Sequence, residues 1–198
     1  MAAASTTPFE YSPLDEQKNE IRVLRILPGV DASTLECRLE HIALEDGSDY
    51  DALSYAWHDP KLYSEAQRDL KHNLLVNGKC LEIGNNLATF LQSARGKQAE
   101  SRQIWIDAIC INQKDVYERN AQVLRMRRIY QKANQVVIWL GPASNRGDDA
   151  VRFLKLVNLT KNNDLSAEWK AMASFLVRAW WNRIWVVQEI VLAKEALV

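Results

Sequence analysis

The pattern of apolar and polar positions near the N-terminus predicts two paired strands. Residues 20–27 are largely apolar, and residues 35–44 alternate apolar with charged side chains, as a strand with one buried face does. The segment between them is rich in turn-forming residues. We therefore expect an N-terminal antiparallel β-hairpin.

Three later stretches are apolar on both faces, which indicates central strands covered by helices on both sides. They are residues 50–57, 104–111 and 136–141. Residues 114–133 predict a helix, because their apolar side chains follow one stripe with Arg and Lys opposite. Strands that alternate with helices predict an α/β fold with a mostly parallel sheet flanked by helices.

The segments between and after these strands predict a second hairpin and more helices. Asn77-Gly78, flanked by β-forming residues, indicates a tight turn, and Asn85 or Asn86 can cap a helix that runs to about Arg95. The further helices are expected at residues 148–157, from about Ser166 and at residues 183–193. The last of them is expected to be largely buried.

The domain organisation follows from length and local composition. Residues 1–19 are small and polar with two prolines, which predicts a flexible N-terminal arm, and residues 20–198 are expected to form one domain. Residues 196–198 resemble the start of another strand, which would make the chain a fragment of a longer protein.

Composition and charge exclude several classes of protein. Twenty-five basic and 25 acidic residues balance, which argues against nucleic-acid binding through a strong basic field. No apolar run reaches the roughly 20 residues of a membrane span, and the N-terminus lacks a secretory signal pattern. Three scattered cysteines favour neither a disulfide framework nor a metal site, so we expect a cytoplasmic protein.

Polar and aromatic side chains follow the predicted central strands. In open α/β sheets ligands bind beyond the carboxyl ends of the strands, where Ser54, Tyr55 and Trp57 follow one strand and Asp107 another. Trp57 could instead pack at the rim of the core, and Asp107 could simply brace its loop. No glycine-rich phosphate loop exists, so a phosphate would be held by helix N-termini and arginines such as Arg119.

Glu189 is a single carboxylate within an apolar helical stretch, RIWVVQEIVLA. A buried carboxylate must be paired, protonated or used, because an unpaired buried charge is costly. The residues leave two interpretations open. Glu189 forms a buried ion pair with Arg119, Arg178 or Arg183, or it is a functional acid that reaches the crevice.

Several long motifs together resemble a known family. YDALSYAW, IWIDAICINQKDVYERNAQVLRMRRIYQKANQVVIWLG and WWNRIWVVQEIVLA resemble, in this order, the HET (heterokaryon incompatibility) domain of filamentous fungi, from about Ile21 to the end. Proteins of that family trigger cell death when incompatible individuals fuse, and further domains usually regulate them. The resemblance implies the same role and a regulatory or incompatibility partner protein here.

HET domains are in turn distantly similar to Toll/interleukin-1 receptor (TIR) domains. This implies a TIR-like, flavodoxin-like sheet, and the order of elements agrees. The stretch RIWVVQEI resembles the TIR pattern W-C-x-x-E-L, whose glutamate is catalytic in members that cleave NAD. The resemblance puts Glu189 at the catalytic position and Trp185 at the tryptophan, with Val186 in place of the cysteine and Ile190 of the leucine.

The implied chemistry suits a single carboxylate. Cleavage of the nicotinamide–ribose bond develops positive charge on the ribose, and the pyridinium leaving group needs no general acid. Glu189 could hold the ribose hydroxyls and stabilise that charge, or act as nucleophile. NAD would be the substrate, with no cofactor and no metal. The expected substrate-binding residues are Ser54, Tyr55, Trp57, Asp107, Arg119 and Trp185.

The resulting hypothesis is a cytoplasmic cell-death module that hydrolyses NAD or cyclises its ADP-ribose once it self-associates. One alternative is a non-catalytic oligomerisation and signalling module, and another is a module that senses nucleotides without turnover. A Glu189 carboxylate open to a crevice with Ser54, Trp57 and Asp107 would favour the enzyme. A carboxylate sealed against an arginine would favour the alternatives.

Overall fold

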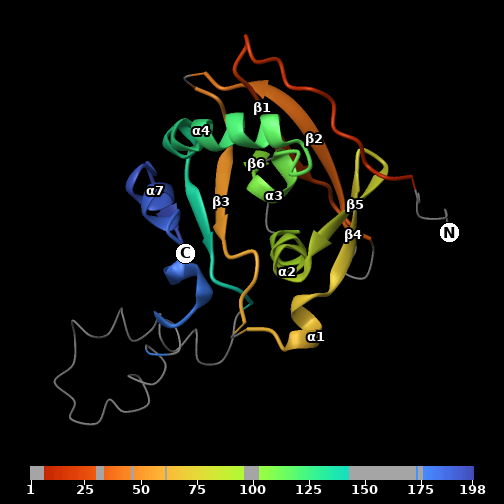
Figure 1. The fold of residues 1–198 in the computed structure, drawn as a ribbon, viewed down its shortest axis with the longest axis vertical. Coiled ribbons are helices and arrows are strands. Elements are labelled where there is room, and N and C mark those ends of the chain that lie inside the picture. Colours follow the sequence, from red (N-terminus) through yellow and green to blue (C-terminus); the bar gives the residue numbers. More distant parts are fainter. Residues whose placement is uncertain are drawn as a thin grey trace.

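The computed structural model describes residues 7–29, 34–45, 47–60, 62–95, 103–142, 173 and 176–198. In this part of the chain, one mixed sheet of eight strands has the order β5-β4-β2-β1-β6-β3-β7-β8 (Figure 1). The helices expected at 148–157 and from Ser166 lie outside the described residues.

The strands are short, as is usual for globular domains. Their bounds are β1 Glu20–Ile26, β2 Glu36–Ala43, β3 Asp51–Tyr55, β4 Lys71–Val76, β5 Lys79–Gly84, β6 Gln103–Trp105, β7 Val136–Trp139 and β8 Ala196–Leu197. The helices are α1 Glu65–Arg68, α2 Asn85–Ala94, α3 Asp107–Cys110, α4 Val116–Lys132, the 3-10 turn η2 Ala179–Asn182 and α7 Val186–Val191. In Figure 1, α3 and α4 lie in front of the sheet and α7 lies beside α4.

The N-terminal hairpin forms as predicted. β1 and β2 pair antiparallel, from Glu20 opposite Ala43 to Ile26 opposite Cys37. The hairpin is nevertheless not an addition at the edge, because β2 also pairs parallel with β4 and β1 pairs antiparallel with β6. The sheet is therefore mixed. In the half that contains β1, β2, β4 and β5 only β2 and β4 pair parallel, so the expectation of a mostly parallel sheet is confirmed only in part.

The other half of the sheet is parallel. β3 lies between β6 and β7, with Ala52 opposite Trp105 on one side and Val136 on the other, and β8 adds to the outer side of β7. All five residues of β3 are buried, which confirms the prediction of a central strand. The carboxyl ends of these parallel strands consequently face one edge of the sheet.

Two local predictions were wrong. The strand expected over residues 104–111 ends at Trp105, and the helix α3 begins at Asp107. The N–H of Cys110 donates a helical hydrogen bond to the carbonyl of Ile106 at 2.7 Å. An apolar run fits such a buried helical turn as well as a strand. The helix expected after the second hairpin is α2, but Gly84 is its N-cap and no side chain caps it.

The last helix also differs from its prediction. α7 spans only Val186–Val191, and within it Val186 and Glu189 are buried while Val187 and Val191 are exposed. Because α7 lies at the periphery and packs through one face, the expectation of a largely buried helix was wrong. The strand start predicted at 196–198 is confirmed as β8.

The described part of the N-terminal arm, residues 7–19, runs along the sheet. Phe9 N–H donates to the carbonyl of Cys80 at 2.8 Å, and Cys80 N–H donates to the carbonyl of Thr7 at 2.8 Å. The Tyr11 hydroxyl donates to the carbonyl of Ile109 at 2.9 Å. The segment thus bridges β5 and α3, and its flexibility stays a prediction.

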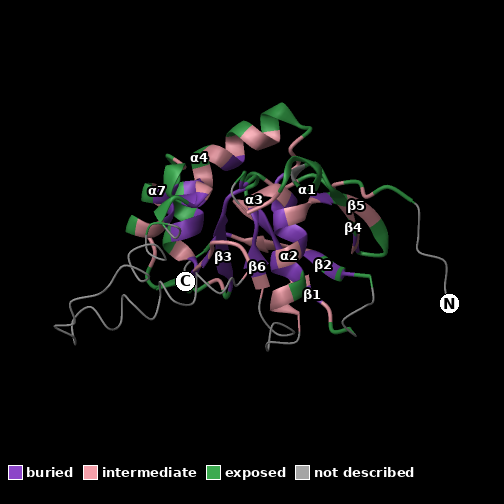
Figure 2. Cartoon of the chain, turned by 90° about the horizontal axis from the view of Figure 1, so that it is seen from below, coloured by how far each residue is buried: buried purple, intermediate pink, exposed green. Residues whose placement is uncertain are grey.

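The buried residues concentrate in the sheet and in the helix faces that pack on it (Figure 2). The largest fully buried side chains include Trp105, Trp180 and Tyr130. Across the described ranges, no helix combines the length and apolar character needed to cross a bilayer.

Candidate functional site

Glu189 lies at the centre of a buried polar cluster. Its carboxylate is fully buried and accepts hydrogen bonds from the Ser54 hydroxyl and from two nitrogens of Arg183, at 3.3 Å and 3.2 Å. The Trp180 indole N–H donates to the Ser54 oxygen at 2.8 Å. We call Ser54, Trp180, Arg183 and Glu189 the Glu189 cluster. It brings together one strand and the C-terminal segment.

Local structure explains how these side chains meet. Ser54 is the fourth residue of the buried strand β3, paired with Ile138 of β7. At the other end of the chain, Arg183 N–H bonds the carbonyl of Trp180 at 3.2 Å, and Val186 N–H bonds that of Arg183 at 3.3 Å. These consecutive turns bring Arg183 back over the carboxylate six residues further on.

The charge of Glu189 is only partly compensated. Burial raises the pKa of its carboxyl above the ordinary value, and the Arg183 guanidinium and the Ser54 hydrogen bond oppose that rise. The Arg183 side chain keeps 20% of its surface exposed, whereas that of Glu189 keeps 1%. Arg183 therefore contacts the buried Glu189 carboxylate and is itself partly exposed to solvent.

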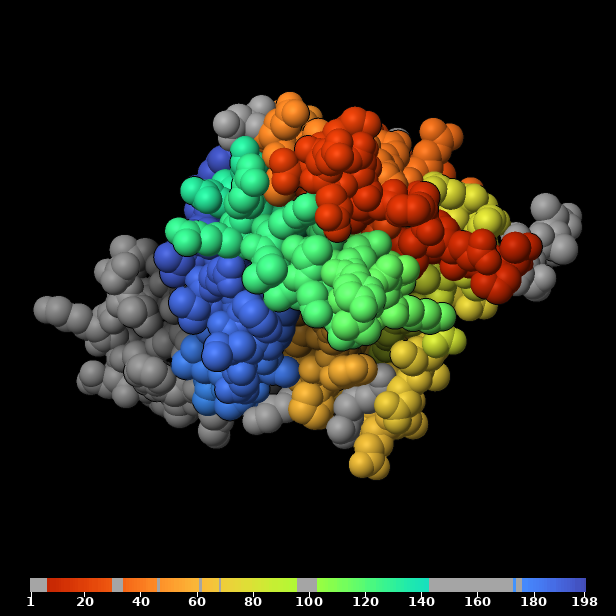
Figure 3. Space-filling model, turned by 45° about the horizontal axis from the view of Figure 1, so that its top comes forward, coloured from red at the N-terminus to blue at the C-terminus, as the bar shows by residue number. Residues whose placement is uncertain are grey.

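A cavity of about 400 Å³ lies on that solvent side. Residues from three parts of the chain line it: Ala56, Trp57, His58, Asp107, Ile111, Gln113, Arg119, Val123, Met126, Ala179, Arg183 and Trp185. Figure 3 shows the same three parts meeting on one face, in orange, green and blue. We call this space the Asp107 cavity. Glu189 does not line it, whereas its ion-pair partner Arg183 does.

Asp107 and Trp57 are paired at the wall of this cavity. The Trp57 indole N–H donates to both carboxylate oxygens, at 3.1 Å and 3.0 Å, while the indole stays 41% exposed. Burial raises the pKa of Asp107 to about 6, and Arg183 and the Trp57 hydrogen bond act in the opposite direction. Asp107 also accepts the N–H of Ala108, so it both braces its loop and faces the cavity.

The structure thus brings together most, but not all, of the residues expected to form the site. Trp57, Asp107, Arg119 and Trp185 line the Asp107 cavity, and Ser54 and Glu189 lie behind Arg183. Arg119 reaches the carbonyl of Gln113 at 3.4 Å. Tyr55 lines a neighbouring cavity instead.

Sequence reasoning identified Arg183 only as one of three candidate partners for Glu189. The structure selects it, since Arg178 donates to the carbonyl of Leu140 at 2.7 Å. Trp180 was missed as a hydrogen-bond donor to Ser54. The Trp180-Trp181 pair was the only local signal, and the pattern does not say which indole is buried.

Chemically, the Glu189 cluster offers a carboxylate with a raised pKa, a serine oxygen and a guanidinium next to a cavity with an aromatic wall. Among the residues with described positions, no three His, Cys, Asp or Glu side chains are grouped to hold a metal ion. The carboxylate would reach a ligand in the Asp107 cavity only after Arg183 moves aside.

The fold and the cluster define an α/β domain that holds a buried, arginine-paired carboxylate behind a surface cavity. The pattern of the "Heterokaryon incompatibility protein (HET)" family matches residues 50–189, which include all four residues of the Glu189 cluster. The chain belongs to this family.

A curated relative supports the same assignment. The chain is 28% identical, over 243 aligned residues, to "Heterokaryon incompatibility protein 6, OR allele" of Neurospora crassa. The alignment covers 100% of this chain and 35% of that protein, so the chain spans about a third of its relative's length. No solved structure matches the chain significantly.

Proposed function

We propose that this chain is a cytoplasmic effector domain of fungal heterokaryon incompatibility that cleaves NAD at the nicotinamide–ribose bond when it self-associates. Family membership and the name of the Neurospora crassa relative support the role in incompatibility. The observation that carries the enzymatic part is the Glu189 carboxylate, which is hydrogen-bonded to Ser54 and paired with Arg183, a residue that lines the Asp107 cavity.

The order of the parallel strands adds support for a TIR-like sheet. In chain order β3, β6, β7 and β8 are the first to fourth parallel strands, and their spatial order is second, first, third, fourth. Flavodoxin-like sheets begin with the same order and bind ligands where it reverses, between the first and third strands. Ser54 lies in the first of these strands, next to that switch point.

The cavity offers suitable partners for the substrate. The Trp57 indole presents an apolar face for the nicotinamide ring, and Arg119 can attract the pyrophosphate. Once Arg183 has moved aside, the ionised Glu189 would stabilise positive charge on the ribose, or attack it, as the carbon–nitrogen bond breaks and nicotinamide leaves with its electron pair. Water then completes the hydrolysis, or a ring nitrogen of the adenine completes a cyclisation.

Arg183 gives this enzyme a resting state. Because its guanidinium engages both carboxylate oxygens, Arg183 would have to move before a substrate could reach Glu189. Self-association would stabilise a conformation in which Arg183 moves toward the cavity, with an incompatibility or regulatory partner as the trigger. A constitutive NAD hydrolase would kill its host, so a closed monomer is the arrangement that such an effector requires.

The closed ion pair also favours a second candidate function. A Glu189 carboxylate sealed against Arg183 suits a non-catalytic module that oligomerises and signals through its surfaces. In that case the Glu189 cluster holds α7 on the sheet, and NAD is not consumed.

The test compares the wild type with Glu189→Gln, which removes the charge but keeps the side-chain size and one acceptor oxygen, and with Glu195→Gln, an exposed control. NAD loss and nicotinamide release are measured for dilute protein and for protein clustered by an inducible oligomerisation tag. Turnover that rises on clustering in the wild type and control, and is absent in Glu189→Gln, would support the enzyme. No turnover in any state, while Glu189→Gln still kills cells, would leave the signalling module.

A further inference from the structure

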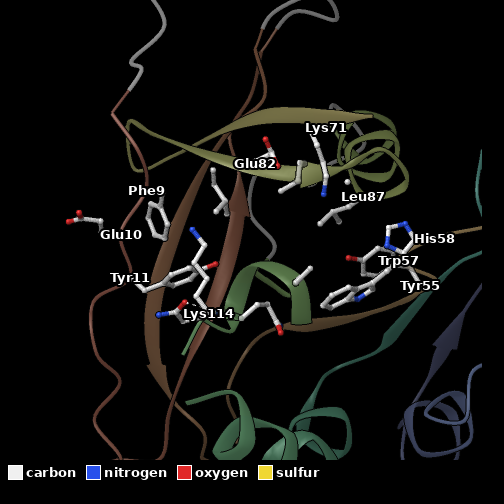
Figure 4. A pocket seen from close by; sticks show the side chains of 16 residues that line it. Phe9, Glu10, Tyr11, Tyr55, Trp57, His58, Lys71, Glu82, Leu87 and Lys114 are labelled. Carbon is white, nitrogen blue, oxygen red and sulfur yellow. Dashed lines mark hydrogen bonds between the residues drawn. The ribbon is translucent and has the colours of Figure 1, made fainter. Parts of the chain in front are cut away.

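A larger cavity, of about 620 Å³, lies beside the Asp107 cavity (Figure 4). The N-terminal arm, the β4–β5 hairpin, the end of β3 and the segment before α4 surround it. Its volume falls in the range of roughly 300–1,000 Å³ that is typical of small-molecule sites. The candidate site described above uses only the wall that the two cavities share, at Trp57, His58 and Gln113.

Aromatic side chains form two opposite sides of this cavity. On the arm, Phe9 and Tyr11 pack edge to face with ring centroids 4.9 Å apart, and the Tyr11 hydroxyl is anchored to the carbonyl of Ile109. At the end of β3, Tyr55 is buried and the Trp57 indole is held by Asp107. Rings whose positions are fixed by other contacts lose little entropy on binding, which suits recognition of a flat ring.

Two lysines determine the charge of the ligand that fits between these rings. The ammonium groups of Lys71 and Lys114 extend into the cavity, whereas the Glu10 carboxylate points away from it (Figure 4). Neither lysine is ion-paired with a carboxylate in the described part of the chain. Aromatic walls alone would accept a cation, but the two ammonium groups outweigh the single lining carboxylate of Glu82 and favour an anion.

We propose that this cavity binds a ligand of the nucleoside monophosphate class, with its base against the aromatic side chains and its phosphate attracted by the ammonium groups of Lys71 and Lys114, which enter the cavity from different sides (Figure 4). The Glu82 carboxylate of β5, which also lines the cavity, is then available to the ribose hydroxyls. The proposal does not depend on cleavage of NAD or on Glu189. It gives the arm and the β4–β5 hairpin a role in binding.

The experiment measures binding of AMP, adenosine and inorganic phosphate by calorimetry at low salt. AMP is expected to bind the wild type at least about tenfold more tightly than adenosine or phosphate alone, because only AMP uses both the rings and the lysines. Lys71→Ala/Lys114→Ala should weaken AMP about tenfold or more. Lys79→Ala/Arg128→Ala removes the same charge from exposed positions outside the cavity and should bind AMP as the wild type does.

Two further variants locate the site and separate it from the proposed enzyme. Phe9→Ala should weaken AMP and adenosine alike, and Glu189→Gln should bind AMP with unchanged affinity even if NAD cleavage is lost or never observed. The proposal is overturned if AMP does not bind at millimolar concentration, if adenosine binds as tightly as AMP, or if the double lysine variant keeps full affinity. It is also overturned if Arg119→Ala, in the Asp107 cavity, abolishes binding while the lysine variant does not.

Discussion

At the scale of single residues, Glu189 shows how a buried carboxylate is stabilised by its neighbours. Its charge is stabilised by the Arg183 guanidinium and the Ser54 hydroxyl, and the Trp180 indole N–H in turn fixes the Ser54 oxygen. A buried pair adds little net stability compared with apolar side chains, but removal of one partner leaves an unpaired charge. Glu189 and Arg183 should therefore respond very differently to single and double substitution.

Arg183→Met should lower the free energy of unfolding by about 3 kcal/mol at pH 7, because the Glu189 charge is left without its partner. The pKa of Glu189 is already raised by burial and should rise further in this variant. A raised carboxyl pKa costs stability only above the pKa of the unfolded chain, so the loss should shrink as the pH falls toward 4.

Urea denaturation at pH 4 and pH 7 measures this effect, with Arg128→Met on the exposed side of α4 as control. The double variant Arg183→Met/Glu189→Gln should regain most of the stability, because no charge remains to be paired. An equal loss at both pH values, or a double variant as unstable as Arg183→Met, would contradict the ion-pair account.

Asp107 predicts a separate pH dependence. Its pKa of about 6 lies above the ordinary 3.8, so the folded state becomes less stable as the pH rises from about 4 to 6. The full shift corresponds to about 3 kcal/mol, and partial exposure reduces this to about 1–2 kcal/mol. Asp107→Asn keeps an oxygen acceptor for Trp57 and should gain that amount over the wild type at pH 7 but nothing at pH 3.5.

Thermal or urea unfolding of both proteins across this pH range gives the difference, in which other titrating groups largely cancel. A difference that stays constant with pH would mean that Asp107 is not destabilised by burial.

The Glu189 cluster was only partly predictable from the sequence. The apolar neighbours of Glu189 show that it needs a partner, and Arg119, Arg178 and Arg183 were the candidates. The choice of Arg183 depends on the turn at η2, and the contact with Ser54 joins residues 135 positions apart. Local patterns carry no information about such a long-range contact, so only the family resemblance brought the two residues together.

At the scale of elements, the turn of the β4–β5 hairpin also attaches this hairpin to the neighbouring strand β2. Asn77 and Gly78 have φ values of 50° and 76°, as the Asn-Gly pattern predicts. The Asn77 side chain in addition accepts the N–H of Leu39 at 3.0 Å and donates to the carbonyl of Leu39 at 3.1 Å. The turn residue therefore attaches the hairpin to β2, where the two strands pair through few residues.

Asn77→Ala should lower the free energy of unfolding by about 2 kcal/mol, since it removes two hydrogen bonds and puts a less tolerant residue at positive φ. Asn77→Gly keeps the turn geometry and should lose only about 1 kcal/mol. Chemical denaturation measures both, with Lys79→Ala on the same hairpin as control. If Asn77→Gly is as stable as the wild type, the side-chain bonds to Leu39 contribute nothing.

Most elements were predictable because hydrophobic period and turn chemistry act locally. The failure at residues 104–111 has a physical cause: a buried helical turn and a central strand are both apolar on every side. The end of β6 at Trp105 is set by the sheet, where β6 pairs only through residues 103–105. The sequence pattern of residues 104–111 alone does not show where the strand ends.

At the scale of the whole molecule, the order of the strands was the feature least accessible to sequence reasoning. Antiparallel pairing of β1 and β2 agrees with their closeness in the sequence, but their place inside the sheet follows from contacts with β4 and β6. One feature of the sequence agrees with an interior position for β1. Residues 21–24 are apolar apart from Arg22, and all four are buried. Interior strands are buried on both faces, whereas an edge hairpin usually is not.

Arg22 connects the arm to the rest of the molecule. Its side chain is 1% exposed, pairs with Glu118 of α4 at 2.6 Å and donates to the carbonyls of Cys110 at 3.0 Å and Ser12 at 2.6 Å. Its guanidinium also stacks on the Tyr11 ring, 4.9 Å from the centroid. One buried side chain therefore links the arm, β1, α3 and α4.

These contacts predict that the arm is ordered in solution even though its composition is that of a mobile segment. The Phe9 amide, which donates to Cys80, should exchange its hydrogen at least about tenfold more slowly than an unprotected amide. Arg22→Met should remove this protection, because the carbonyl of Ser12 and the ring of Tyr11 lose their partner. Arg25→Met, at a partly exposed position of β1, should preserve it. Hydrogen exchange followed by NMR measures both variants. An unprotected Phe9 amide in the wild type would mean that the arm leaves the sheet in solution, and the larger cavity would then lose one of its aromatic walls.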